Sequence, residues 1–290
     1  LDRHPSLDLL QGDSDSQRNY SDTVIQRILY TLDPLRAGRV TDSQMRRAGG
    51  TFCDALDSLD GDATEDICLE GRFFSYEHFY VIFSKFTDLD DDADGELSCD
   101  DLLRYGNGAI SQRATERIFC LLRRGRGHIK YEDFVWFLLS EEDKSSSTAV
   151  GFWFRVLDVD DDGRVSRHDM EHLYTEQRAR LLELSQEDVA FDDIVCQLLD
   201  AVHPRAWDGV SRSDGFTLHD LRRSKLCPQL VNMLCNIDKF LASEAQDMHA
   251  LRQAHATPHL TDFERWASLE YWRVTEEQDQ HQHGAICNAR

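Results

Sequence analysis

The sequence predicts an all-α fold built from repeated helix–loop–helix units, and three observations support this prediction. A six-residue pattern recurs six times: an apolar residue, then Ser, Thr or Lys, two variable residues, an acidic or polar residue and a large apolar one. Each copy follows a turn-rich stretch and lies between segments with the apolar spacing of helices. Two of these turn-rich stretches contain Asp-x-Asp-x-Asp-Gly. The copies are VTDSQM from Val40, FSYEHF from Phe74, LSCDDL from Leu97, IKYEDF from Ile129, VSRHDM from Val165 and FTLHDL from Phe216.

This arrangement is that of the EF-hand, in which a short loop joins two helices and supplies oxygen ligands to calcium. The recurring apolar residue corresponds to loop position 8, which pairs with its counterpart in a second hand, so six hands make three pairs. We therefore expect an elongated helical array of paired EF-hands, with two calcium-competent loops and about four degenerate ones. The expected pairs of loops are 33–44 with 67–78, 90–101 with 122–133, and 158–169 with 209–220.

The Ser-rich segment EEDKSSSTA, from Glu141 to Ala149, is the best internal boundary. It separates an expected N-terminal EF-hand region at 1–144, with the first four loops, from a C-terminal EF-hand region at 145–275, with the last two. The polar end of the chain, residues 276–290, is expected to be a disordered tail.

The loop at 90–101 has the residue types that a calcium loop requires. Its Gly95 stands at position 6, where the chain must turn sharply, and Ser98 at position 9 is suited to holding a bridging water. Calcium prefers carboxylate and carbonyl oxygens, which this spacing curls around one point. The expected ligands are the side chains of Asp90, Asp92, Asp94 and Asp101 and the backbone carbonyl of Glu96.

The loop at 158–169 repeats this design, with Gly163 at position 6 and Ser166 at position 9. A solvated acidic loop is the alternative interpretation for each of the two, but the glycine and the apolar residue at position 8 favour a metal site. The expected ligands here are the side chains of Asp158, Asp160, Asp162 and Asp169 and the backbone carbonyl of Arg164.

Both loops depart from the usual EF-hand at position 12, where Glu normally binds with two oxygens. Asp101 and Asp169 are one methylene shorter, so they reach the ion less easily. We therefore expect weaker calcium binding with fewer ligands. Mg²⁺, which prefers six ligands, is the alternative ion.

The other four loops lack a ligand set. The loop at 33–44 has Leu35 and Ala37 in place of carboxylates, and the loop at 67–78 ends in His78. The 122–133 loop, LRRGRGHIKYED, is basic where ligands belong, and the 209–220 loop keeps only Asp220 in a suitable place. Their expected role is structural, completing each pair.

The composition limits the functions that are open to the chain. Its 290 residues hold 54 Asp and Glu against 32 Lys and Arg, a net charge of −22, which disfavours nucleic-acid binding through a basic surface. No apolar run is long enough to span a bilayer, and no secretory signal is visible. The eight scattered cysteines are typical of free thiols in a reducing compartment. We expect a cytoplasmic location, with the nucleus and the cytoskeleton or centrosome as alternatives.

One motif suggests chemistry of another kind. His168, Glu171 and His172 match H-x-x-E-H, an inverted zinc-protease pattern, and helical spacing places the two histidines on one face. Zinc hydrolysis would also need a third ligand and a substrate cleft, and no candidate stands out. An exposed pair on the helix after the second calcium loop is the favoured interpretation, and a metallohydrolase is the disfavoured one.

Over nearly its whole length the chain resembles the B'' (B-double-prime) regulatory subunits of protein phosphatase 2A. The segments that carry the resemblance are HPSLDLLQ, FFSYEHFYVIFSKFTDLDDDADGELSCDDLLRYGNGAIS, IKYEDFVWFLLSEEDKSS, FWFRVLDVDDDGRVSRHDMEHLYTEQ, DIVCQLLDAVHP, TLHDLRRSKL and LTDFERWASLEYWR. The family's variable N-terminal region is not recognised in this sequence. The chain does not begin with Met, so we expect a fragment of a longer protein.

The resemblance implies a non-enzymatic subunit that docks on the HEAT-repeat scaffold subunit and the catalytic subunit, and that directs the phosphatase to chosen phosphoproteins. It also implies calcium binding at 90–101 and 158–169, although Asp169 departs from the Glu of the family's second loop. The alternative is a stand-alone EF-hand calcium sensor or adaptor for another target.

Overall fold

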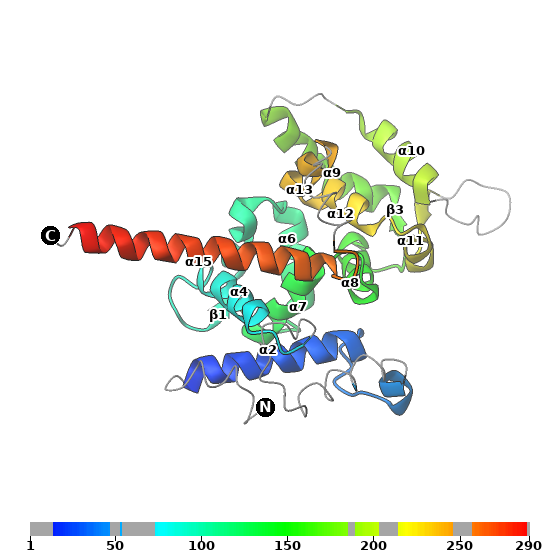
Figure 1. The fold of residues 1–290 in the computed structure, drawn as a ribbon. Helices are drawn as coiled ribbons and strands as arrows, with labels where there is room; N and C mark the ends of the chain where they lie inside the picture. Colours follow the sequence, from blue (N-terminus) through cyan, green and yellow to red (C-terminus); the bar gives the residue numbers. More distant parts are fainter. Residues whose placement is uncertain are drawn as a thin grey trace.

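The computed structural model describes residues 14–46, 53, 73–184, 189–202, 214–245 and 257–288, with side chains described as far as residue 277. These residues form helices joined by loops and four two-residue strands (Figure 1). The first half contains α2 (Ser14–Leu32), α4 (Tyr76–Thr87), β1 (Glu96–Leu97), α5 (Cys99–Leu103), the 3-10 helix η2 (Tyr105–Gly108), α6 (Gln112–Leu122), β2 (Ile129–Lys130) and α7 (Tyr131–Glu142). The second half contains α8 (Ser147–Leu157), β3 (Val165–Ser166), α9 (Arg167–Glu183), α10 (Phe191–Val202), β4 (Gly215–Phe216), α11 (Leu218–Ser224), α12 (Cys227–Cys235), α13 (Ile237–Glu244) and α15 (Asp262–Asn288).

Two of the three expected loop pairs are confirmed by their strands. In the antiparallel pair β1–β2, Leu97 lies opposite Ile129, which joins the 90–101 loop to the 122–133 loop. In β3–β4, Val165 lies opposite Phe216, which joins the 158–169 loop to the last loop. A Cβ on Gly215 would lie 2.4 Å from the carbonyl oxygen of Val165, so only glycine permits this approach. The apolar residues at position 8 thus identify the partners correctly.

The third expected pair, 33–44 with 67–78, lies partly outside the described residues, because residues 67–72 are not described. The described residues of that pair form no strand. Helix α2 instead packs on α7 and α4. The ring of Tyr30 meets the Trp136 ring edge-on at 5.0 Å, and Tyr20 donates a hydrogen bond to the carbonyl of Phe74 at 2.8 Å. The first helix is therefore held by aromatic packing.

One buried apolar cluster extends through most of the described residues, from Tyr30 in α2 to Ala267 in α15. Trp153 of α8 is fully buried in it, and α7 packs directly on α8 across the Ser-rich segment. The two expected regions are also joined by backbone hydrogen bonds, from Ser111 N–H to the Cys235 carbonyl at 2.8 Å and from Ile237 N–H to the Ala109 carbonyl at 3.0 Å. The core is thus continuous across residue 144.

Helix α15 returns to the first half of the chain and runs alongside α4 (Figure 1). Its Phe263 and Tyr271 rings contact His78 and Tyr80 of the earlier hand at 5.3 and 5.6 Å. The structure continues this helix through 276–288, where the sequence predicts a disordered polar tail. None of the helices described in the structure has the length and the apolar composition needed to cross a bilayer.

Candidate metal centres

The loop at 90–101 is organised by its first aspartate. Asp90 accepts hydrogen bonds from the backbone N–H of Asp94 through Oδ1 at 3.2 Å and of Gly95 through Oδ2 at 3.0 Å. Gly95 has a φ of +79°, which glycine adopts without strain. Asp94 in turn accepts from the N–H of Glu96 at 2.8 Å. The chain therefore curls around its own carboxylates, as the spacing predicts.

The loop at 158–169 repeats these contacts at the matching positions. Asp158 accepts from Asp162 N–H at 3.1 Å and from Gly163 N–H at 2.9 Å, and Gly163 has a φ of +85°. Asp162 accepts from the N–H of Arg164 at 2.7 Å. The two loops thus have the same local fold, which follows from the same residue types at the same spacing.

In both loops the carboxylates at positions 1, 3 and 5 converge, with oxygens within 4.8 Å of one another. Burial raises the pKa of the first carboxylate in each loop, Asp90 and Asp158, and the neighbouring carboxylates add to the rise. Mutual repulsion of this kind is relieved by a divalent cation, so the donor set fits a hard metal ion. The two groups are Asp90, Asp92 and Asp94 in the first loop, and Asp158, Asp160 and Asp162 in the second.

The aspartates at position 12 are not members of these two groups of described carboxylates. Asp101 and Asp169 each use Oδ2 to accept from the N–H and the hydroxyl of the serine three residues earlier, forming a capping box at the start of α5 or α9. The hydroxyl contact is 2.6 Å in both loops. Ser98 and Ser166 therefore act as helix N-caps, and a shorter acid at position 12 serves the helix as well as the loop.

The residues at position 7 are expected to offer only their backbone carbonyls, and their side chains lie in other contacts. The Glu96 carboxylate pairs with Nδ1 of His128 at 2.7 Å, across the β1–β2 pair. The Arg164 guanidinium donates to the carbonyl of Gly215 at 3.3 Å, across β3–β4. Each side chain therefore links one of the two candidate metal loops to its partner loop.

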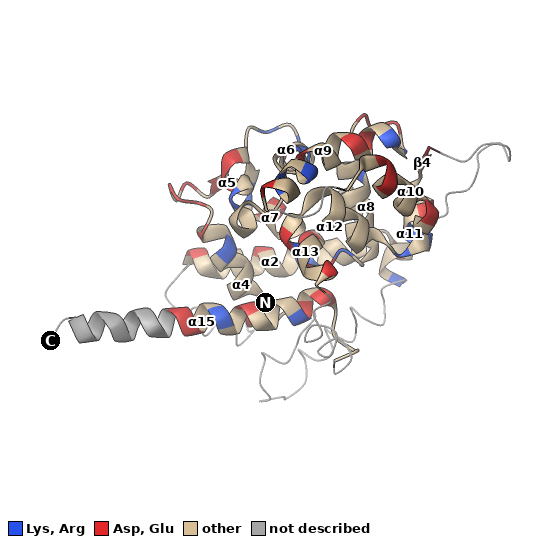
Figure 2. Ribbon diagram, turned by 90° about the horizontal axis from the view of Figure 1, so that it is seen from above, with Lys and Arg blue, Asp and Glu red and all other residues tan. Residues whose placement is uncertain are grey.

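The surroundings of the two loops differ. Acidic residues crowd the exposed loop between α4 and α5 (Figure 2), where Asp90 and Asp101 are half-buried. In the second loop Asp158 is only 5% exposed and Asp169 is fully buried. The sequence marks the ligands but gives no sign of this difference in enclosure.

Each loop is also held by an arginine that the sequence did not single out. Arg104, just after the first loop, pairs with Asp91 at 2.7 Å and with Asp101 at 3.1 Å. Arg117 reaches the second loop from α6, where it donates to the Asp158 carbonyl at 2.6 Å and to the Asp161 carboxylate at 3.0 Å. Arg104 is detectable as a neighbour in sequence, whereas Arg117 is not.

Comparison with known proteins shows which families this chain resembles. An EF-hand domain family model matches residues 1–62. The chain is 39% identical over 284 residues to an Arabidopsis thaliana protein named as a probable B''epsilon regulatory subunit of serine/threonine protein phosphatase 2A, covering 96% of this chain and 52% of the relative. It is 39% identical over 279 residues to the human B''-beta regulatory protein of the same phosphatase, covering 93% of this chain and 47% of the relative.

A solved structure described as a PP2A PR70 holoenzyme contains a chain that is 39% identical to this one, with a TM-score of 0.76. The match covers 83% of this chain and 87% of that chain. The chain belongs to the B'' family of protein phosphatase 2A regulatory subunits. It spans about half the length of the curated B'' relatives it matches.

Two of the hands that the sequence predicts to be degenerate keep part of the EF-hand geometry. In this B'' chain Asp33 accepts from Gly38 N–H at 2.8 Å, with a φ of +73° at the glycine, so the 33–44 loop folds like the two candidate metal loops although Leu35 and Ala37 replace the carboxylates at positions 3 and 5. In the 122–133 loop the final residue, Asp133, is ion-paired with Arg36 and Arg126. Two guanidinium groups thus neutralise the carboxylate that would otherwise face an ion.

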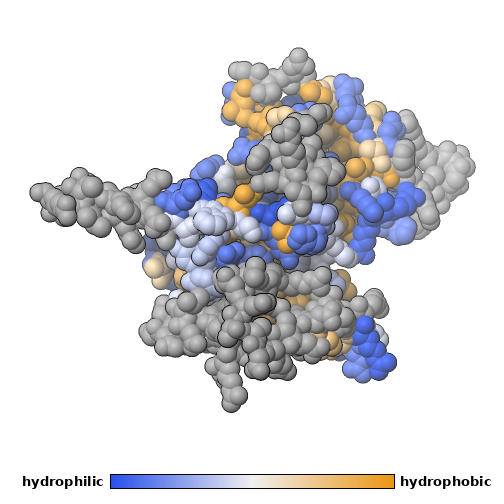
Figure 3. All heavy atoms as spheres, in the orientation of Figure 1, coloured by the Kyte–Doolittle hydropathy of each residue, from blue (hydrophilic) through white to orange (hydrophobic). Residues whose placement is uncertain are grey.

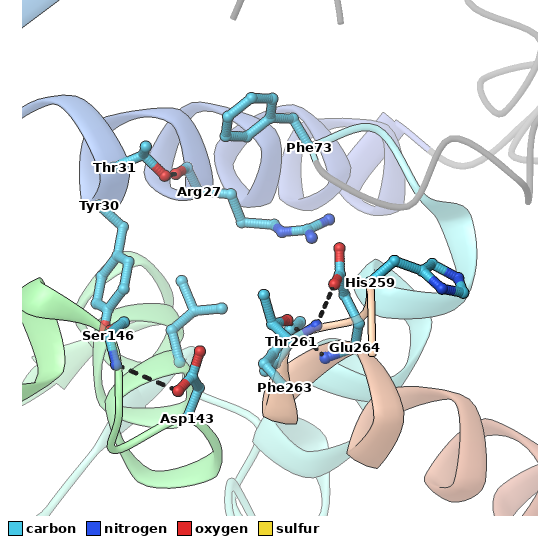
Figure 4. A pocket seen from close by; sticks show the side chains of 11 residues that line it. Arg27, Tyr30, Thr31, Phe73, Asp143, Ser146, His259, Thr261, Phe263 and Glu264 are labelled. Carbon is cyan, nitrogen blue, oxygen red and sulfur yellow. Dashed lines mark hydrogen bonds between the residues drawn. The ribbon is translucent and has the colours of Figure 1, made fainter. Parts of the chain in front are cut away.

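The remaining alternatives gain no support from the described residues. His168 is exposed, and neither it nor His172 belongs to a described group of three or more metal-binding side chains. A separate cavity of about 320 Å³ lies between α2, the end of α7 and the start of α15 (Figure 4). Arg27 points into it opposite Glu264, but Glu264 already accepts from the Thr261 N–H at 2.6 Å, as in a helix cap. This cavity is best explained as packing space between helices.

Proposed function

We propose that this chain is a calcium-binding regulatory subunit of protein phosphatase 2A. In this role it docks on the scaffold and catalytic subunits, selects phosphoprotein substrates and catalyses no reaction itself. The observation that carries the proposal is the coincidence of two features. The chain is 39% identical to B'' subunits over almost all of its length, and two loops hold matched aspartate triads.

Calcium is the ion that the loops fit best. Each offers three converging carboxylates and a backbone carbonyl near a sharp glycine turn, which suits an ion that accepts six to eight oxygens at flexible geometry. Because Asp101 and Asp169 are short and also cap helices, Mg²⁺ remains the competing ion at both loops.

Titration calorimetry on chelator-treated protein tests the metal sites. We expect at most two calcium sites, with weaker binding of magnesium. Three or more specific sites would contradict the assignment of the other four loops as degenerate. Loss of one site each in the double variants Asp90→Ala, Asp92→Ala and Asp158→Ala, Asp160→Ala would assign the sites to the two loops.

Pull-down of the scaffold and catalytic subunits by the tagged chain tests the partner assignment. We expect capture of both subunits, weakened more by the 90–92 double variant than by the 158–160 one, because the first loop is more exposed and more available to a partner. Changing the exposed Asp88 and Asp100 together to Asn removes the same charge from next to the ligands without removing a ligand, and this variant serves as the control. Calcium binding without capture of either subunit would favour the stand-alone sensor.

The non-enzymatic character has its own test. The isolated chain should hydrolyse no phosphoprotein, and changing His168 and His172 to Ala should leave the activity of the reconstituted phosphatase nearly intact. A collapse of that activity, with folding preserved, would revive the metallohydrolase hypothesis.

A further inference from the structure

A basic cavity lies where the loop after α2 meets the 122–133 loop. Its volume is about 580 Å³, and four cationic side chains line it, from Arg36, Arg124, Arg126 and Lys130. We call this cavity the basic cleft. Calcium binding does not account for it, because Arg124, Arg126 and Lys130 stand at positions of the 122–133 loop where an EF-hand would place ligands.

Two arginines of the basic cleft are held in place by residues of helix α7 and of the 122–133 loop. The Asp133 carboxylate, 3% exposed, binds Arg36 through Oδ1 at 2.9 Å and Arg126 through Oδ2. The Arg36 guanidinium also lies over the Trp136 ring, 4.6 Å from its centre, and Arg126 Nε donates to the Arg123 carbonyl at 3.1 Å. A ligand would therefore meet guanidinium groups that have already lost much of their rotamer freedom.

The charges in the basic cleft are not balanced. Four cations line it against three acids, Asp33, Glu132 and Asp133, which leaves one net positive charge. The charge of Asp133 is directed at Arg36 and Arg126, with which it is ion-paired. Arg124 and Lys130 are exposed and form no ion pair with a described residue.

The cations of the cleft also repel one another. Burial lowers the pKa of Arg36, and the charges of Arg124 and Arg126 add to the fall. In a chain with a net charge of −22, such a surplus of positive charge marks a place suited to an anion.

The surface near the cleft favours a peptide over a nucleic acid. Trp136 is 3% exposed and its face is covered by Arg36, so it offers no ring on which a base could stack. The loop after α2, at the lower right of Figure 3, adds exposed hydrophilic residues, including Arg39 and Arg46. A short anionic side chain reaching into the basic cleft fits these features better than an extended stacked strand.

We propose that the basic cleft binds the phosphorylated serine or threonine of a partner peptide, an inference that rests on the regulatory role proposed above. A phosphate group carries nearly two negative charges and three acceptor oxygens, which match a guanidinium fork and an ammonium group side by side. Arg124 and Lys130 make the direct contacts, and Arg36 and Arg126 supply the field behind them. A carboxylate brings half the charge and binds less tightly.

The cleft also adjoins the first calcium loop. Lys130 lies directly opposite Glu96 in the β1–β2 pair, and His128 of the same segment pairs with the Glu96 carboxylate at 2.7 Å. An anion bound at Lys130 is therefore one strand pair away from the loop that holds Asp90.

The test uses the full chain and a fluorescein-labelled peptide library with fixed phosphoserine and degenerate flanks, followed by fluorescence anisotropy. We expect the phosphorylated library to bind about tenfold more tightly than its unphosphorylated and Glu-substituted counterparts, because the site is built for a doubly charged group. The double variant Arg124→Gln, Lys130→Gln should abolish that preference. Arg18→Gln with Arg155→Gln removes the same charge from exposed positions outside the cleft and should keep it.

Competition and assembly complete the design. Inorganic phosphate should displace the peptide from the wild-type chain at an ionic strength where chloride does not, and displacement by both alike would overturn the proposal. So would equal affinity for the phosphorylated and unphosphorylated libraries. Capture of the scaffold and catalytic subunits is measured on the same protein samples. If the chain captures both phosphatase subunits but does not prefer the phosphorylated library, only the proposal for the basic cleft is overturned. If the wild-type chain captures neither subunit, the proposed regulatory role is overturned.

Discussion

The loops at 90–101 and 158–169 have the same local design in different surroundings. In each, the first aspartate accepts from the N–H groups at positions 5 and 6, and three carboxylates converge. The first aspartate of the second loop is only 5% exposed, and its last is fully buried, whereas their counterparts in the first loop are half-buried. Identical ligand spacing therefore does not imply identical binding energetics.

The arginines beside the two loops sharpen this contrast. Arg104 comes from the chain just after the first loop and contacts Asp91 and Asp101, so the first loop is stabilised by its own hand. Arg117 comes from α6, which enters the 122–133 hand, and donates to Asp158 and Asp161. The second loop thus also contacts a helix of another EF-hand pair, whereas the contacts of the first loop described above lie within its own pair of hands.

The largest expected difference concerns the first aspartate of each loop. In chelator, Asp158→Ala should lower the free energy of unfolding by about 2 kcal/mol, because the N–H groups of Asp162 and Gly163 lose a buried acceptor. Asp90→Ala should cost less than about 1 kcal/mol, because water can replace the carboxylate in its exposed loop. Urea unfolding followed by circular dichroism measures both values.

Asp158→Asn is the matched control, since the amide keeps an acceptor oxygen but removes the charge. Because the two N–H groups bind different oxygens of Asp158, the single amide oxygen should recover about half of the stability lost in Asp158→Ala. Equal losses for the two alanine variants would show that the enclosure of the second loop has no energetic weight.

The next difference concerns position 12. Asp101→Glu should tighten calcium binding at the first loop by about tenfold, because a longer side chain in a half-exposed place can bring a second oxygen to the ion. Asp169→Glu should bring no such gain. Its carboxylate is fully buried and accepts from the Val159 N–H at 3.1 Å, so an added methylene must displace neighbours.

Calorimetry on proteins whose other loop is inactivated measures each affinity separately. Asp100→Glu, which lengthens an exposed side chain of the first loop that is not an expected ligand, should leave calcium binding unchanged. An unchanged affinity in Asp101→Glu would show that the length of this side chain does not limit binding.

Local spacing was enough to predict the loops and two of their partnerships. The glycine turn and the alternate aspartates depend on contacts between residues a few positions apart, such as Gly95 and Asp90. The apolar residue at position 8 pairs with its counterpart in the partner loop, as Leu97 does with Ile129. Arg117 could not be found in this way, because its contact with Asp161 spans 44 residues and depends on how α6 packs. The same holds for Arg36, whose pairing with Asp133 spans 97 residues.

At the end of the chain, composition predicts less structure than the molecule has. Its polar composition predicts disorder, yet α15 extends to Asn288. The helix is anchored further back, where Tyr271 meets Tyr80 and Lys85 pairs with Glu270. These contacts with α4 come from residues far apart in the sequence, so composition alone does not reveal them.

A smaller difference is expected when the two arginines are changed. Arg104→Met should tighten calcium binding at the first loop by about threefold, because the guanidinium no longer competes with the ion for Asp101. Arg117→Met should change the affinity of the second loop less, since Arg117 bonds only backbone carbonyls and the non-ligand Asp161. It should instead lower the free energy of unfolding by about 1 kcal/mol.

Arg155→Met, an exposed change in α8, is the control for both arginine variants. Calorimetry and urea unfolding on the same samples separate affinity from stability. A large loss of affinity in Arg117→Met would mean that α6 positions the ligands themselves, and the second loop would then be governed by the neighbouring hand.

The smallest expected difference is in the response to salt. Charges that face water are screened over about 10 Å at 0.1 M ionic strength, whereas buried charges are screened much less. Because Asp92 and Asp94 stand in a loop whose first and last aspartates are only half-buried, added salt should weaken calcium binding there about twofold more than at the second loop. Titrations of single-site variants in potassium chloride and in choline chloride would separate screening from competition by K⁺, since only screening is common to both salts. If calcium affinity falls equally at both loops, the greater burial of Asp158 and Asp169 does not protect the bound ion from screening. The difference between the loops then concerns only the stability of the metal-free protein.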